Sequence, residues 1–122
     1  MAWTTQGTDR KAAAATTVDA TPTVVLTYIV RGGQASWLEI TVIGRKTATA
    51  DYLVMRERGV ATEASGAATW SSQQQDTARS GGAAAWVVAV AASASTITVT
   101  VTGVAANTID WRVSVEGEHA EN

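Results

Sequence analysis

The sequence predicts an all-β fold: a single-domain antiparallel β-sandwich of jelly-roll or Greek-key type, with about seven to eight strands. Residues 96–103 alternate threonine with Ile97, Val99 and Val101, and residues 109–116 repeat this two-residue period. Such alternation is typical of strands that bury one face and expose the other. We expect these two strands to pair with each other. Similar segments recur at intervals of about 8–12 residues with no helix of useful length between them, as in sandwiches and barrels.

Each expected strand follows a turn signal. Pro22 suits the entry to the first strand because proline fixes φ and lacks a backbone donor. Gly32 and Gly33 mark the turn before the second strand. Residues 64–82 are rich in Ser, Gln, Ala and Gly, and we expect a long exposed loop there. The expected strands are residues 24–30, 37–45, 52–58, 60–63, 83–92, 96–103 and 109–116.

The chain of 122 residues fits one domain. We expect an N-terminal arm over residues 1–20, a β-sandwich over residues 21–118 and a frayed C-terminus over residues 119–122. Alanine supplies much of the apolar content and there is no Phe, so the core is thin for the chain length. Small domains with thin cores are commonly stabilised by oligomerisation or by attachment to a larger body.

The composition argues against two classes of partner. The formal net charge is −2 and only 16% of the residues are charged, so the clustered Lys and Arg that bind nucleic acid are absent. The longest uncharged apolar run, residues 83–94, is too short and too rich in alanine to span a bilayer. The first residues lack the pattern of a signal peptide, and the absence of Cys excludes disulfides and thiolate metal sites. We therefore expect no nucleic-acid partner and no membrane partner.

Catalytic and cofactor chemistry find little support in the sequence. His119 is the only His and lies close to the end of the chain, where it is poorly placed to act as a catalytic base. Glu39 and Asp110 fall on the exposed faces of strands, and no carboxylate pair for glycoside hydrolysis can be assigned. Metal-binding and phosphate-binding motifs are absent. We predict that the protein is not an enzyme and binds no cofactor and no metal.

Three tryptophans lie within expected strands. Trp111 is in phase with Ile109 and Val113, which predicts a core position. Trp86 and Trp37 belong to strands that carry apolar residues on both faces. Strands of that kind are normally covered on both sides, so a neighbouring subunit is one candidate for the second cover.

The remaining tryptophans lie in the expected loop and arm. Trp70 stands in the polar loop, and Trp3 precedes the cations Arg10 and Lys11 in the arm. An arm with two cations can become ordered on a partner surface, and exposed tryptophans are frequent interface anchors. The candidate partner-binding residues are Trp3, Arg10, Lys11, Trp37, Ile43, Trp70 and Gln74.

Four segments together resemble a β-rich module of structural proteins of tailed bacteriophages. They are TVDATPT at residues 17–23, the pair Ala85-Trp86, VTVTG at residues 99–103 and NTIDWR at residues 107–112. The resemblance covers about residues 16–118; in such proteins a T-D-A-T-P-T segment opens the domain and a V-T-G…I-x-W segment closes it. This chain departs from a tail-fibre polypeptide because we expect it to start at its own Met1 without a long fibrous stem.

The resemblance implies a virion component that works by binding, is usually homotrimeric and is assembled in the host cytoplasm. The first hypothesis is a capsid decoration or cement protein, whose arm lies across neighbouring subunits of the major capsid protein while its trimer caps their junction. The alternative is a tail-fibre or receptor-binding module, in which Trp70 and residues 73–76 contact a host surface glycan or receptor. A second alternative is a carbohydrate-binding or carbohydrate-active domain, which would need a concave aromatic face.

Overall fold

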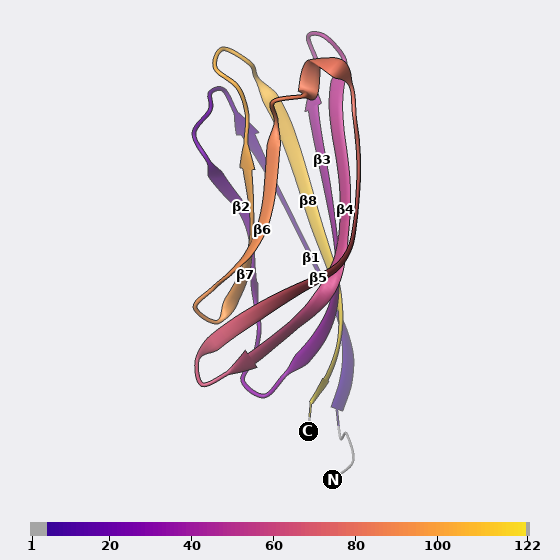
Figure 1. The fold of residues 1–122 in the computed structure, drawn as a ribbon, viewed down its shortest axis with the longest axis vertical. Coiled ribbons are helices and arrows are strands. Elements are labelled where there is room, and N and C mark those ends of the chain that lie inside the picture. The colour runs from indigo at the N-terminus through magenta and orange to yellow at the C-terminus, as the bar shows by residue number, and fades with distance from the viewer. Residues whose placement is uncertain (1–4, 122) are drawn as a thin grey trace.

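Two antiparallel sheets pack face to face, which confirms the predicted β-sandwich (Figure 1). The computed structural model describes the backbone of residues 5–121 and the side chains of residues 9–118. The strands are β1 (Thr5–Thr17), β2 (Thr23–Ile29), β3 (Ala35–Lys46), β4 (Asp51–Ala64), β5 (Ala67–Arg79), β6 (Val87–Ser93), β7 (Thr96–Thr102) and β8 (Ile109–Glu121), and a short 3₁₀ helix, η1 (Gly81–Ala83), precedes β6.

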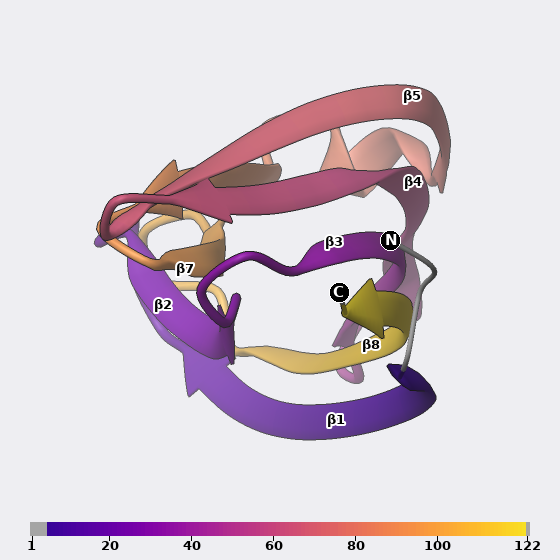
Figure 2. The ribbon, with the colours of Figure 1, turned by 90° about the horizontal axis from the view of Figure 1, so that it is seen from below.

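The two sheets differ in width and in strand length. The larger sheet has the order β1-β8-β3-β4-β5, and the smaller one has the order β2-β7-β6. Figure 2 shows the five strands of the larger sheet in this order from bottom to top, with β2 and β7 at one side. Strands of the larger sheet have 12 to 14 residues, whereas each strand of the smaller sheet has 7.

The expected pairing of residues 96–103 with residues 109–116 is wrong. β7 lies in the smaller sheet between β2 and β6, and β8 lies in the larger sheet between β1 and β3. The buried residues of the two strands therefore meet across the core. Alternation fixes which face of a strand is buried, but it does not identify the strand's hydrogen-bonded neighbour.

The expected free arm is corrected as well, because β1 is a full strand of the larger sheet. Residues 5–17 pair with β8 over the whole length of β1, from Thr5 opposite Glu121 to Thr17 opposite Ile109. The Lys11 ammonium also donates to the carbonyl of Thr27 at 2.5 Å. The same ladder carries β8 to Glu121, beyond the start of the frayed end predicted at residue 119. Short alanine-rich segments have a weak strand signature, so sequence pattern alone does not reveal them.

The expected loop over residues 64–82 is mostly strand. β4 runs through Gly59 without a break, and β5 follows it after a two-residue turn. Ser65 and Gly66 both have positive φ, at 55° and 83°, as in the tight turns that match the twist of a hairpin. The strand expected from residue 83 begins only at Val87, after η1 at residues 81–83, and it forms a hairpin with β7.

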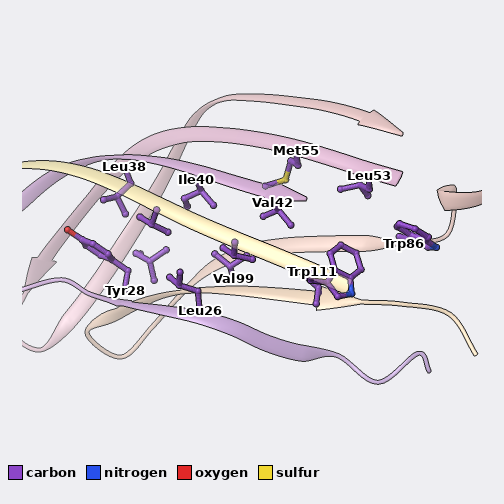
Figure 3. Packing of buried hydrophobic residues seen from close by; sticks show 14 of the residues in the cluster. Leu26, Tyr28, Leu38, Ile40, Val42, Leu53, Met55, Trp86, Val99 and Trp111 are labelled. Carbon is purple, nitrogen blue, oxygen red and sulfur yellow. The ribbon is translucent and has the colours of Figure 1, made fainter. Parts of the chain in front are cut away.

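The core lies between the sheets and is filled by alternate residues of the strands. In Figure 3 the side chains of Leu38, Ile40 and Val42 on β3 project into the layer that also holds Leu26 and Val99. Trp86 and Trp111 are both buried, which confirms the core position predicted for Trp111. Their rings meet edge to face with centroids 5.7 Å apart, a favourable geometry for an aromatic pair.

Gly44 makes room for the Trp111 ring. A Cβ atom at residue 44 would stand 2.6 Å from Cζ3 of Trp111, and Gly44 is the direct cross-strand partner of Trp111 in the β3–β8 ladder. The indole Nε1 of Trp111 donates to Thr17 Oγ1 at 2.9 Å, which ties the same ring to β1. The largest core side chain therefore depends on a missing side chain in the next strand.

We predict that Gly44→Ala destabilises the fold by about 1–3 kcal/mol, the usual cost of overpacking a well-filled core. Urea unfolding followed by tryptophan fluorescence measures the effect. Gly81→Ala is the matched control, since nothing lies within 4 Å of a Cβ at that position. Equal unfolding midpoints for the two variants would contradict this account of Gly44.

Asp51, the first residue of β4, links two connecting segments at one end of the larger sheet. Its carboxylate accepts hydrogen bonds from Thr49 Oγ1 at 2.6 Å and from Ser80 Oγ at 2.9 Å. The Thr49 hydrogen bond and then the Ser80 hydrogen bond are the main reasons why the pKa of Asp51 lies below its usual range. The charged carboxylate thus joins the β3–β4 turn to the segment that leads from β5 to η1.

A lowered pKa in the folded state stabilises the protein at pH values above the ordinary Asp pKa of about 3.9, and this stabilisation is lost as the pH falls through the lowered value. We therefore expect wild type to be more stable than Asp51→Asn at pH 6, and the difference to shrink toward pH 2. Denaturant midpoints at several pH values measure it. A difference that stays constant over this range would show that the Asp51 charge is not responsible.

Candidate functional site

The side of the larger sheet that faces away from the core is the most extended uncovered surface, and we call it the outer face. No described element packs against it. Alternation and strand register decide its members. Its described residues are Arg10, Ala12, Ala14 and Thr16 of β1; Asp110, Arg112, Ser114, Glu116 and Glu118 of β8; Trp37, Glu39, Thr41, Ile43 and Arg45 of β3; Tyr52, Val54, Arg56, Arg58, Val60 and Thr62 of β4; and Thr69, Ser71, Gln74, Asp76 and Ala78 of β5.

Large apolar side chains are exposed on the outer face. Ile43 and Val54 are direct cross-strand partners with 44% and 38% of their surface exposed. Tyr52 lies one pair further along the same face, opposite Arg45, and Trp37 lies toward the other end of β3 with 42% exposed. Isolated exposed apolar residues are ordinary, but a group of them on one sheet face is typical of an interaction surface.

Two hollows flank the Ile43–Val54 pair. A hollow of about 490 Å³ lies on the β1 side, where Ala12 and Ala14 leave space beside Ile43. A second hollow of about 340 Å³ lies on the β5 side, where Ala78 stands beside Val54. The small side chains of the outer strands thus leave an apolar ridge with a hollow on each side.

A row of charges crosses the middle of the outer face. Glu39 Oε1 lies 3.4 Å from Arg56 Nε, and Glu39 Oε2 lies 3.7 Å from Arg58 Nε. Glu116 is the cross-strand partner of Glu39, and its Oε1 lies 3.9 Å from Arg10 NH2. Two carboxylates directly opposite one another would repel, so the arginines on either side compensate for them. We interpret the row as a ladder of ion pairs.

The structure brings four of the seven predicted contact residues to the outer face. Trp37 and Ile43 lie on it from β3, Arg10 from the edge strand β1 and Gln74 from the edge strand β5. Gln74 Nε2 donates to Asp76 Oδ2 at 3.2 Å. Tyr52 and Val54 belong to the same surface but were not among the predicted residues, although their alternation with Leu53 and Met55 could have revealed them.

Two of the other predicted contact residues, Lys11 and Trp70, are not on the outer face. Lys11 reaches across the sandwich edge to β2, as described above. Trp3 lies outside the described residues. Trp70 does not stand in a polar loop: it projects toward the inner side of β5, and its indole Nε1 donates to Glu57 Oε2 at 2.7 Å. The prediction that Trp70 stands free for contact as part of a loop is therefore wrong.

Glu57 is a buried carboxylate that sequence analysis did not identify. It is 5% exposed, and besides Trp70 it accepts a hydrogen bond from Gln75 Nε2 at 3.0 Å. Gly59 allows this arrangement, since a Cβ there would lie 2.7 Å from Cη2 of the Trp70 ring. Buried charges are tolerated where hydrogen-bond donors satisfy them. In the sequence, Glu57 is in phase with Leu53 and Met55, and this two-residue period is the signal that places it on the core side.

We expect Trp70→Phe to destabilise the protein by about 1–3 kcal/mol, because the aromatic ring is kept while a buried carboxylate loses a donor. Thermal and urea unfolding provide the measurement. Ile29→Val, at an exposed position of the smaller sheet, is the control, and its effect should stay within about 0.5 kcal/mol, as for most surface substitutions. Equal effects of the two changes would show that the Glu57–Trp70 hydrogen bond contributes nothing.

Neither a cluster of metal-ligating side chains nor a membrane-spanning helix occurs in the part of the chain that the structure describes. Within this part of the chain, no three His, Cys, Asp or Glu side chains gather closely enough to hold a metal ion. The helical content of the described residues includes no segment that is long and apolar enough to cross a membrane. The arrangement of the outer face, with apolar ridge, hollows and ion pairs, suits binding of a complementary surface.

Comparison with known proteins gives similarities to solved structures only. No protein-family model matches the chain, and no curated protein matches it. The tailspike protein of Acinetobacter phage vB_ApiP_P1 shares 16% identity with a TM-score of 0.42, over 87% of this chain and 20% of that chain. The tailspike of Acinetobacter baumannii bacteriophage Fri1, a capsular polysaccharide depolymerase, shares 17% identity with a TM-score of 0.40, over 91% of this chain and 17% of that chain.

A third similar structure is the tailspike protein of Acinetobacter baumannii phage AM24, with 11% identity and a TM-score of 0.43, over 97% of this chain and 26% of that chain. This chain therefore spans only 17% to 26% of the length of these three tailspikes. TM-scores below 0.5 do not transfer a tailspike's activity or ligand to this chain.

Proposed function

We propose that the chain is a non-catalytic assembly module of a tailed-bacteriophage virion, in a tail-fibre or receptor-binding structure, and that it works by packing its outer face against another protein surface. The observation that carries the proposal is the gathering of Trp37, Ile43, Tyr52 and Val54 on an uncovered sheet face. Burying such side chains against a partner is favourable by roughly 25 cal/mol per Å² of apolar surface.

The sequence resemblance to phage structural modules supports a role in the virion. Segments 17–23 and 107–112, which carry part of that resemblance, meet in the folded chain: the β1–β8 ladder ends with Thr17 opposite Ile109, and Trp111 donates to Thr17. These residues thus form one structural unit at the end of the larger sheet. A shared structural role for the two segments is consistent with a module that recurs in proteins of one kind.

The first hypothesis, capsid decoration, depended on an arm that could lie across neighbouring capsid subunits. Residues 5–17 are instead paired with β8, and detaching them would leave the backbone groups of β8 without partners on one side. A tail module needs no such arm. We therefore favour the tail over the head.

Immunogold labelling of intact virions from the encoding phage tests this proposal, with an antibody raised against the purified protein. Gold at the tail is the expected result. Gold distributed over the heads would replace the proposal with capsid decoration, and particles without gold, whose denatured proteins also give no signal on a blot, would overturn a virion role. Antibody absorbed beforehand with the purified protein is the control for specific labelling.

A further inference from the structure

The outer face is large enough for a stable interface. Adjacent strands lie about 4.8 Å apart and each residue adds about 3.3 Å, so five strands of this length present roughly 950 Å². A standard protein interface buries about 800 Å² on each partner. The smaller sheet, with three strands of 7 residues, presents only roughly 330 Å² by the same measure. Of the two sheet faces, the outer face alone reaches the area that a stable partner needs.

The charges of the outer face are divided between its two halves. On β8, Asp110, Glu116 and Glu118 outweigh Arg112, which leaves two negative charges in excess. β4, on the other side of β3, carries the opposite net charge. Its described residues on the outer face include Arg56 and Arg58 and no acidic residue.

The two edge strands also carry charges of opposite sign on the outer face. β1 presents Arg10 as its one described charge on the outer face, and β5 presents Asp76 there. The order across the sheet is therefore positive on β1, negative on β8, balanced on β3, positive on β4 and negative on β5. This pattern changes sign when it is reversed about β3.

A surface with this property is complementary to a rotated copy of itself. We propose, in extension of the proposed assembly function and resting on it, that the partner of the outer face is a second copy of this chain, related by a two-fold axis parallel to β3. That axis places β4 over β8 of the partner and β1 over β5 of the partner, so strands of opposite net charge lie over one another. Arg58 then faces Glu116 of the second copy at the same level along the strands.

The same axis brings small and apolar residues of the central and edge strands together. Ile43 on the central strand lies against its own counterpart, and the small residues Ala14 and Ala78 face each other from the edge strands. The hollows beside Ile43 and Val54 receive side chains of the partner. β3 lies over itself under either axis. A two-fold axis perpendicular to the strands would also stack β4 on β4 and β8 on β8, so that strands of like net charge face each other, which is unfavourable.

Light scattering of the purified chain tests the proposal first. The 12.6 kDa chain is expected to have the mass of a dimer. Ile43→Asp should raise the dissociation constant at least about tenfold, because a charge is buried at the centre of the interface. Ile29→Asp is the matched control: Ile29 is also exposed, at 64%, but lies on the smaller sheet, and this variant should remain a dimer with an unchanged circular dichroism spectrum.

A charge exchange tests the axis. One variant carries Arg56→Glu and Arg58→Glu, and a second carries Glu116→Arg and Glu118→Arg. Each alone should be monomeric, since like charges then meet on β4 and β8, whereas an equimolar mixture should recover the dimer mass. Recovery also shows that both variants fold.

Three results would overturn the self-association: a monomeric wild type at 100-fold the concentration used for the variants, a mass that Ile43→Asp does not change, or a mixture that stays monomeric. A trimer would also overturn it, since a two-fold axis cannot generate one. A monomer whose antibody labels the virion tail would refute only the self-association, and a dimer absent from virions would refute only the proposed function.

Discussion

The pairing of the first and last strands is the constraint on which the rest of the molecule depends. β1 and β8 lie side by side along their whole length, and this ladder gives the larger sheet two of its five strands. It fixes the position of Trp111, whose indole is bonded to Thr17 on β1 and lies over Gly44 on β3. It also extends the outer face beyond β3 and β4, so that Arg10 reaches Glu116. Without the ladder, Trp111 would lose its hydrogen bond to Thr17, and the uncovered surface would lose the part that β1 adds.

The sequence pattern predicts faces well and neighbours poorly. The alternation around Ile97 and Trp111 identified two strands and their buried sides. The same pattern predicted the core position of Trp111 and left that of Trp86 open. The pattern did not reveal that β7 and β8 belong to different sheets, because hydrogen-bond partners are chosen by long-range packing. It also missed β1 and β5, whose alanine, serine and glutamine side chains bury too little apolar surface to produce a visible period.

The residues of the candidate site were likewise predictable by strand face but not by strand neighbour. Trp37 and Ile43 were recognisable as residues on a second apolar face, because both faces of β3 carry apolar side chains. Gln74 and Arg10 joined them only through strand register, which the sequence does not contain. Trp70 was misassigned because its surroundings in the sequence are polar; its true partner is Glu57, a residue of the preceding strand that lies in phase with Leu53.

The β1–β8 ladder also has a consequence for how the chain acquires its structure. β1 is made before the other seven described strands, but its partner β8 is made after them, with about a hundred residues between the two. Until then β1 and β3 each present an unpaired edge, a form of exposure that favours aggregation. The final ladder can form only after β8 has been synthesised, so folding of this sandwich is expected to be slow.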